Sequence, residues 1–262
     1  MAQQEAWDSI ADYWEASQSK NSGDGNDMFT ECLLPVLDEL VGYQPGQTVL
    51  DLGTGTGIVA RHFAKKGAEV IGLDFSEAMI EIAKTRAENV DIKVEYEKMD
   101  LMEFDHMEEF AHKHPNKFDI ITISTTLKSL SSLEPIAEAL PLLLKECGCV
   151  VIVDLHPAFS KPAGHRAMEV FEDPTTGKQQ LQTWIKVENY LEFHIRRARQ
   201  SEDNPCHSLF SSLLEPFVQN GLVVDRVREP AFANEGADLE HPQSYHNFPQ
   251  FPMLLAIRLK HK

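Results

Sequence analysis

The sequence predicts an α/β fold built on a mostly parallel sheet that helices cover on both faces. Between residues 45 and 156, short apolar runs alternate with amphipathic helical segments, the pattern of a parallel sheet with crossover helices. The first apolar run ends in a glycine-rich turn, residues 53–57, which leads directly into a helical segment. In open sheets of this class, ligands bind at the carboxyl ends of the strands. The sequence therefore predicts both the layered architecture and the place of a ligand site.

The alternation gives approximate bounds for each element. We expect strands over 48–52, 69–74, 91–97, 118–124 and 148–155, with helices over 57–66, 77–88, 103–113 and 132–145. Gly67 is suited to end the first of these helices and Ser76 to cap the second, whereas Pro141 should end or kink the fourth. Two further strands, 222–228 and 253–259, would complete the sheet.

Composition limits the possible partners. The chain has 262 residues and a formal net charge of −17, and its one short basic cluster is at residues 196–199. Because a nucleic-acid binder needs a basic surface, we expect no nucleic-acid partner. Residues 1–5 lack signal-peptide features and no apolar run is long enough to cross a bilayer, so we expect a cytoplasmic protein without a membrane partner. No cysteine or histidine spacing indicates a metal site, and the oligomeric state is unknown at this stage.

The turn after the first strand predicts a nucleotide or nucleoside site. Its motif, Asp51-x-Gly-x-Gly-x-Gly57, leaves bare backbone N–H groups at the positive end of a helix. These glycines also fit the dinucleotide fingerprint, and Asp74 lies about where its ribose-binding acid should be. Asp51, however, would repel a pyrophosphate and suits a ligand that carries an ammonium and a sulfonium. A tight turn without any ligand is the third interpretation.

Four further segments follow this motif in order. They are Val70–Ser76, Glu97–Leu101, Phe118–Ser124 and Leu143–Val153. Together, over roughly residues 45–155, they resemble the class I S-adenosylmethionine-dependent methyltransferases. The resemblance implies a Rossmann-like, doubly wound sheet of seven strands in the order 3-2-1-4-5-7-6, mostly parallel with an antiparallel last strand. It also implies S-adenosyl-L-methionine as cofactor and methyl transfer by in-line displacement.

The flanking segments are expected to add to this core. We expect residues 1–44 to form a helical lid, because an amino-terminal helix often closes over the cofactor in this family. Residues 45–156 would be the cofactor-binding core. Residues 157–206, long for a sheet connection, are expected to be a cap insertion on the substrate side, and residues 207–262 would complete the core sheet.

The family motifs, together with the charge of Asp51, assign cofactor contacts position by position. The expected contacts are Tyr13, Trp14, Asp51, Gly53, Thr54, Gly55, Asp74, Phe75, Met79, Asp100, Leu101, Ser124 and Thr125. Asp74 would bind the ribose hydroxyls and Asp100 the adenine amino group. Phe75, Met79 and Leu101 would pack on the adenine ring.

The acceptor side carries fewer indications. His156 follows the fifth strand, at the edge where an acceptor must arrive, and is the candidate catalytic base because imidazole titrates near neutrality. Lys128 and Ser129 stand where many small-molecule members of the family carry a histidine pair, so that turn is not expected to supply a base. Ser124 is not followed by the Asn/Asp-Pro-Pro-aromatic motif of enzymes that methylate base nitrogens. With the acidic charge, these departures favour a small organic acceptor with O, N or S as nucleophile.

Two other functions remain open from the sequence. The first is an NAD-dependent oxidoreductase on a Rossmann sheet, which Asp51 disfavours. The second is a non-catalytic, cofactor-binding regulator of methyltransferase fold, which the sequence does not distinguish from an enzyme.

Overall fold

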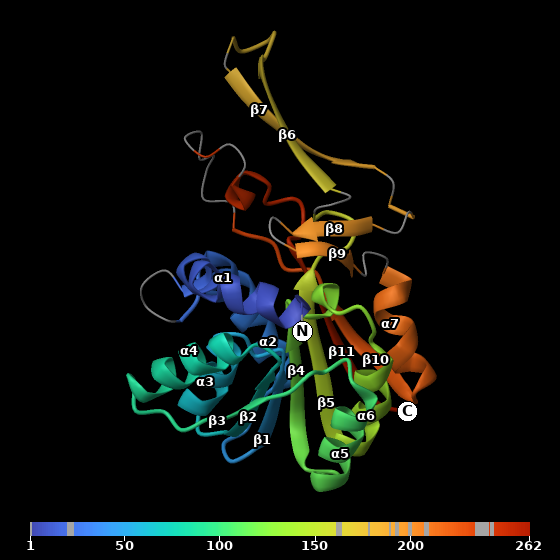
Figure 1. Ribbon diagram of the computed structural model, residues 1–262. Coiled ribbons are helices and arrows are strands. Elements are labelled where there is room, and N and C mark those ends of the chain that lie inside the picture. The colour runs from blue at the N-terminus through green and yellow to red at the C-terminus, as the bar shows by residue number, and fades with distance from the viewer. Residues whose placement is uncertain are drawn as a thin grey trace.

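A seven-stranded sheet forms the centre of the molecule (Figure 1). The computed structural model describes residues 2–19, 24–160, 164–177, 179–188, 190–191, 194–198, 201–206, 210–233, 241 and 244–262. The sheet consists of β1 (Thr48–Leu52), β2 (Glu69–Asp74), β3 (Glu95–Lys98), β4 (Phe118–Ser124), β5 (Leu144–Leu155), β10 (Leu222–Arg228) and β11 (Leu254–His261). Its order is β10-β11-β5-β4-β1-β2-β3. The strands from β1 to β5 pair in parallel, and β11 is antiparallel to both β5 and β10. The predicted fold class is confirmed.

Helices cover both faces of this sheet (Figure 1). The helices of the central and C-terminal parts are α3 (Ile58–Lys65), α4 (Glu77–Glu88), α5 (Phe104–Lys113), α6 (Glu134–Leu143) and α7 (Phe210–Gln219). On one face, α5, α6 and α7 bury apolar side chains against the sheet. On the other face, α3 packs together with α2 (Leu34–Val41). Each strand of the sheet centre is therefore buried from both sides, as its apolar sequence requires.

Some element bounds differ from the sequence expectation. β3 begins at Glu95 rather than at residue 91, because the chain turns at Asp91, whose φ is +53°. β5 begins earlier than expected, at Leu144, which pairs with Phe118. α6 passes Pro141 and ends at Leu143. α7 was not anticipated.

The amino-terminal segment divides between two roles. α1 (Ala2–Ser19) lies beside the carboxyl edge of the sheet and contacts α4 (Figure 1). A π-helical turn, η1 (Met28–Leu33), then leads into α2, whose Leu37 and Leu40 are fully buried. Pro35 falls in the first turn of α2, directly after the π-helical turn η1 passes into the α-helix. Within residues 1–44, α1 is placed as a lid would be, whereas α2 belongs to the core layer.

The segment 157–206 contains two antiparallel hairpins. The first pairs β6 (Gly164–Glu172) with β7 (Gln179–Val187) and extends away from the core, and the second pairs β8 (His194–Ala198) with β9 (Ser201–Cys206) (Figure 1). The guanidinium of Arg166 lies over the Tyr245 ring, 3.9 Å from its centroid, and joins the first hairpin to the loop between β10 and β11. That loop contains the short 3₁₀ helix η3 (Tyr245–Asn247).

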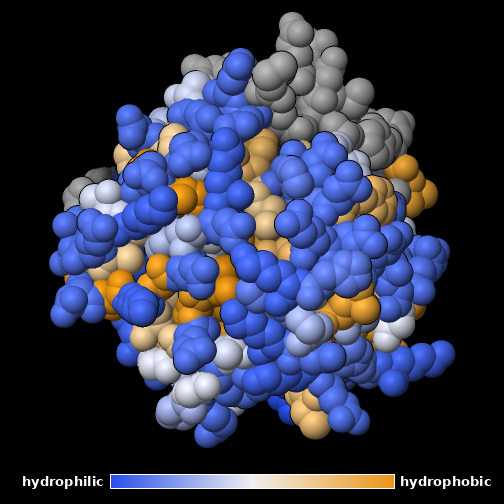
Figure 2. Space-filling model, turned by 60° about the horizontal axis from the view of Figure 1, so that its bottom comes forward, coloured by the Kyte–Doolittle hydropathy of each residue, from blue (hydrophilic) through white to orange (hydrophobic). Residues whose placement is uncertain are grey.

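The face in Figure 2 is mostly hydrophilic, with apolar residues in small separate groups. No helix in the described part of the chain is both long and apolar enough to cross a membrane.

Phe118 offers a test of the core. Its side chain is fully buried at the start of β4 and stacks on Phe110 of α5, with ring centroids 6.3 Å apart. Phe118→Ala should lower the free energy of unfolding by about 3–5 kcal/mol, because it removes a buried ring and leaves a cavity. Urea denaturation would measure the loss. Phe104→Ala is the matched control, because Phe104 is 49% exposed; an equal loss in both variants would contradict this packing.

Candidate cofactor site

One cavity opens at the carboxyl ends of β1, β2 and β4, beneath α1. It encloses about 900 Å³ of space, part of it open to solvent. Every cofactor position expected from the sequence lines it except Tyr13. The wall also includes Trp7, Gln18, Phe29, Thr56, Ile58, Val59, Met102, Thr126, Ser129 and Leu130. The structure thus brings the scattered motif residues to one place.

The glycine turn forms the floor of the cavity and is fixed by close contacts. Thr54 N donates to Leu73 O (2.8 Å), and Gly57 N donates to Thr54 O (2.9 Å). Gly53 has a φ of +69°, and a Cβ at this position would overlap the Thr126 side chain. Thr126 Oγ1 lies 3.2 Å from Gly53 O and 2.9 Å from Ser124 O. This close approach requires glycine at residue 53 and joins the turn to the end of β4.

Asp51 is a buried carboxylate in the cavity wall, with 1% of its surface exposed. Its two oxygens accept hydrogen bonds from Thr54 Oγ1 and Thr122 Oγ1, both at 2.7 Å. Thr122 is its direct neighbour on β4, so strand register puts both side chains on the same face. The pKa of Asp51 is raised to about 6, mainly by burial and in part by the nearby Asp74 carboxylate. The two hydrogen bonds oppose this rise. At neutral pH the cavity therefore holds a largely ionised, weakly solvated acid.

Asp74 organises the opposite side of the turn. Its Oδ2 accepts from Gly55 N (2.9 Å) and its Oδ1 from Ser76 N (3.0 Å). Burial raises the pKa of Asp74, and these backbone N–H groups oppose the rise by stabilising the anion. A carboxylate oxygen can accept more than one hydrogen bond, so each can also take a donor from a ligand. Asp74 is thus both a brace for the glycine turn and an acceptor in the cavity wall.

Residues after β3 continue the wall. Asp100 Oδ1 accepts from Met102 N (2.9 Å), which orients its carboxylate. Leu101 and Met79 are buried and present apolar surface to the cavity. Apolar side chains beside a carboxylate suit a purine ring that carries an amino group.

The end of β4 contains two unusual features. Ser124 Oγ is buried and finds no hydrogen-bond partner among the described residues. Thr125 has a φ of +53°, which is rare for a β-branched residue and costs on the order of 1–3 kcal/mol. Its backbone N donates to Val153 O (2.8 Å), and this bond holds the strained conformation. A lone buried hydroxyl and local strain on the cavity wall are both typical of a ligand site.

α1 closes the cavity from above. Trp7 and Trp14 both line it, and their rings meet edge to face at 5.5 Å. The helix is attached to the N-terminus of α4, where Asp8 Oδ1 accepts from Ser76 Oγ (2.5 Å) and Ala78 N (3.3 Å). A carboxylate is stabilised at this position by the helix dipole. The attachment therefore holds the tryptophans over the site.

Tyr13 lies outside this wall. Its side chain is 69% exposed, because it is one residue out of step with the Trp7–Trp14 face of α1. Trp7 was missed as a contact, although its spacing of seven residues from Trp14 places both on one helix face. The helical periodicity of this segment could have identified Trp7, in place of Tyr13, as an expected cofactor contact.

His156 does not line the cavity. Its Nδ1 accepts from Ala158 N (3.2 Å), and its Nε2 lies 3.0 Å from Glu229 Oε1. Burial lowers the pKa of His156, and Glu229 opposes this by raising it. Both ring nitrogens have partners, so this arrangement argues against His156 as a catalytic base. Lys128 also lies elsewhere, with Nζ 3.1 Å from Ser160 Oγ.

Comparison with known proteins agrees with this geometry. Residues 49–148 match the family model described as a methyltransferase domain. The chain is 32% identical over 115 residues to a ubiquinone biosynthesis O-methyltransferase of Acinetobacter baylyi, a match that covers 44% of this chain and 46% of that protein. A protein of the same description from Klebsiella pneumoniae is 34% identical over 105 residues, which cover 40% and 41%. The chain thus spans less than half the length of these relatives.

Solved structures extend the likeness to the whole fold. An S-adenosylmethionine-dependent methyltransferase from Mesorhizobium loti superposes with a TM-score of 0.65 at 22% identity, covering 91% of this chain and 99% of that one. A methyltransferase from Aquifex aeolicus gives a TM-score of 0.55 at 17% identity, with 96% and 97% covered. At this identity the likeness concerns the fold alone. It includes the segments on either side of the methyltransferase domain.

The raised pKa of Asp51 predicts how this residue affects stability. The folded pKa of about 6 lies above the ordinary value of 3.8, so the carboxyl gains a proton on folding between these pH values. Stability from this protonation is present below pH 4 and is lost as the pH rises through 6. Ionised Asp51 therefore costs on the order of 3 kcal/mol at pH 7.5. Without ligand, Asp51→Asn should melt at a higher temperature than the natural chain at pH 7.5, and this gap should shrink at pH 5.

Differential scanning fluorimetry at both pH values would measure the gap. The exposed Asp105→Asn serves as control and should melt with the natural chain. A gap for Asp51→Asn that is equal at pH 5 and pH 7.5 would contradict the buried, ionised carboxylate.

Proposed function

We propose that this chain is an S-adenosylmethionine-dependent methyltransferase that acts on O, N or S of a small organic acceptor. The charge of the cavity wall carries the proposal. Among the described residues that line it, Asp51, Asp74 and Asp100 are acidic and none is lysine, arginine or histidine. Such a wall attracts a ligand with a sulfonium and an ammonium, and it repels the pyrophosphate of a dinucleotide. The same observation disfavours the NAD-dependent alternative.

The residues present fit the cofactor. Asp74 would accept from the ribose hydroxyls and Asp100 from the adenine amino group. Phe75, Met79 and Leu101 would pack on the adenine. The buried Ser124 hydroxyl, which has no partner among the described residues, would gain one from the bound molecule.

The methionine part would lie over the glycine turn. The residues proposed to contact it are Gly53, Thr54, Gly55, Ser124 and Thr125. Main-chain atoms at Ser124 and Thr125 would bind its ammonium, with Asp51 supplying the compensating negative charge.

The protein's own part in the reaction is mainly positioning. The bound cofactor supplies an activated methyl group on a good leaving group. Trp7 and Trp14 line the cavity and would cover the bound cofactor, and the glycine turn would fix its reacting end. Holding two reactants in line in a dry site can provide most of the acceleration.

The wall also bears on the acceptor. Since none of its described residues is a histidine or lysine, the site favours an acceptor that needs no strong base, such as a thiol, a phenol or a neutral amine. The O-methyltransferase relatives match 115 and 105 residues, less than half of this chain. The family model matches residues 49–148, a segment that holds most of the proposed cofactor contacts, whereas α1 and the hairpins of residues 157–206 lie outside it. The choice between oxygen, nitrogen and sulfur is therefore left to experiment.

Titration calorimetry with S-adenosylhomocysteine tests cofactor binding. Saturable binding with one site per chain is expected, and NADH should give no heat. Saturable NADH binding without a response to S-adenosylhomocysteine would overturn the proposal. Turnover on a panel of thiols, phenols and amines would then separate an enzyme from a non-catalytic binder.

Asp74→Ala tests the ribose contact. It should weaken S-adenosylhomocysteine binding by about 1–3 kcal/mol, because donors that the carboxylate satisfies lose their partner. Asp105→Ala, at an exposed site on α5, should bind like the natural chain. An unchanged dissociation constant in folded Asp74→Ala would show that the ribose lies elsewhere.

Asp8→Ala tests the attachment of α1. Removing the carboxylate that caps α4 should cost about 0.5–2 kcal/mol of lid closure and speed cofactor release several-fold. Stopped-flow tryptophan fluorescence would follow the release, since Trp7 and Trp14 line the site. Asp12→Ala is the matched control on the exposed side of α1. Equal release rates in both variants would argue against Asp8 as the attachment.

A further inference from the structure

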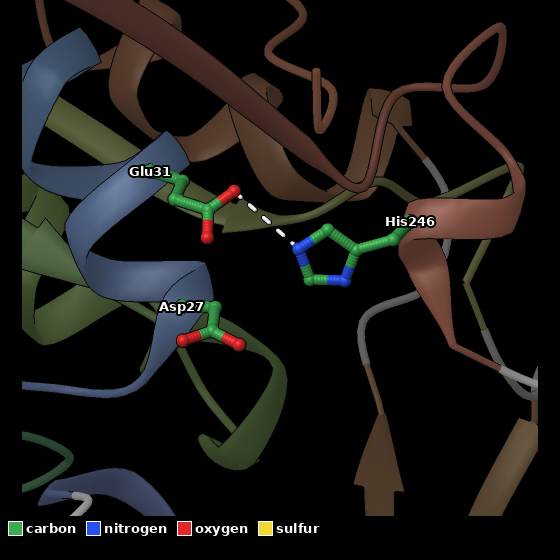
Figure 3. A group of neighbouring side chains, drawn as sticks. All are labelled: Asp27, Glu31 and His246. Atoms are coloured by element: carbon green, nitrogen blue, oxygen red, sulfur yellow. Dashed lines mark ion pairs between the residues drawn. The ribbon is translucent and has the colours of Figure 1, made fainter. Parts of the chain in front are cut away.

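Three side chains from the two ends of the chain meet outside the cofactor cavity. They are Asp27 and Glu31, at the start of η1 and within it, and His246 from η3 (Figure 3). One ligand atom of each lies within 4.8 Å of the other two. Figure 3 shows both carboxylates and the imidazole ring facing the same space. This arrangement is made by folding alone, because more than two hundred residues separate Glu31 from His246.

The imidazole is held in the orientation that a metal ligand needs. Ser244 Oγ lies 3.0 Å from His246 Nδ1, so the hydroxyl fixes one ring nitrogen. The ring also packs on Phe232, with centroids 4.2 Å apart. The other nitrogen, Nε2, therefore faces the carboxylates, 3.4 Å from Glu31 Oε2. In metal sites, a polar partner on the far nitrogen commonly orients a ligating histidine in this way.

The geometry of the cluster suits a cation. Two carboxylates and one imidazole nitrogen supply three possible ligand atoms from two distant segments of the chain. A cation at about 2.1 Å from each atom needs ligand atoms about 3–4 Å apart. The three ligand atoms lie within 4.8 Å of one another, so small side-chain rotations would bring them to this spacing.

The position gives such a cation a structural consequence. Phe29, between the two acids, lines the cofactor cavity. On the other side, Tyr245 precedes His246 and supports Arg166 of the β6–β7 hairpin. A cation would thus join the segment beneath α1 to the loop that carries the hairpin.

We propose that Asp27, Glu31 and His246 bind one divalent transition-metal cation of the Zn²⁺ or Mn²⁺ class. One imidazole and two carboxylates suit these ions, and water completes their coordination. The cation joins the N-terminal segment to the β10–β11 loop. This inference is independent of the proposed methyl transfer, and its test needs no turnover.

Calorimetric titration of the full chain with ZnCl₂, and separately with MnCl₂, tests the site. One cation per chain is expected for at least one of the two salts, together with a higher melting temperature. His246→Gln and Glu31→Gln should each weaken this binding at least tenfold. The paired control is His112→Gln and Glu108→Gln, which removes the same groups from exposed positions four residues apart on α5.

Three outcomes would overturn the proposal. The first is no saturable binding of either cation by the folded chain. The second is cation binding that His246→Gln leaves intact, which would place the ion elsewhere, for example on the exposed Cys147 thiol. The third is an equal loss in the α5 control. Without metal, His246→Gln and Glu31→Gln should melt at the same temperature as the natural chain, which would show that their loss of binding is not a loss of folding.

Discussion

The site depends on an acid that the fold keeps away from water. β1 carries Asp51 into the interior, and strand register sets it opposite Thr122, so that two threonine hydroxyls take the place of solvent. Its burial raises the pKa and makes the ionised form costly in the free protein. That cost is useful only if a positive ligand repays it, as a sulfonium and an ammonium do. A stable fold alone would place a neutral side chain at this position, and the buried carboxylate is therefore the clearest physical sign of function.

Around this acid, the remaining features serve rigidity. Gly53 allows the turn to touch Thr126, Thr125 adopts a strained backbone conformation, and Asp74 ties the turn to the start of α4. These contacts fix the cavity floor before any ligand arrives, and a fixed floor suits a reaction that depends on alignment. The cover is different in kind. α1 is attached to α4 through a few polar contacts.

The molecule thus combines a rigid core with an assembled roof. Residues 49–148 of the core match a methyltransferase domain model, and the likeness of the fold to a solved structure covers 91% of the chain. We use roof for the segments outside the core, namely α1, η1, the two hairpins and the β10–β11 loop, which come from distant parts of the chain. Among their described residues, those that line the cofactor cavity belong to α1 and η1. Its joints are ring contacts and ion pairs, such as Arg166 on Tyr245 and His246 with Glu31. The cluster at Asp27 lies at one of these joints, where a bound cation would have the greatest effect on the roof.

The sequence by itself predicted the strands and helices of the core from short-range patterns, and its resemblance to class I methyltransferases implied the strand order and the expected cofactor contacts. Alternating apolar runs specify strands, and a glycine turn after the first strand specifies a site at the carboxyl edge. Tertiary structure decided what no local pattern records. Trp7 rather than Tyr13 lines the cavity, and His156 lies outside the described cavity wall with a partner at each ring nitrogen. The cluster of Asp27, Glu31 and His246 forms only in the folded protein, because contacts between residues so far apart in the sequence depend on the whole fold.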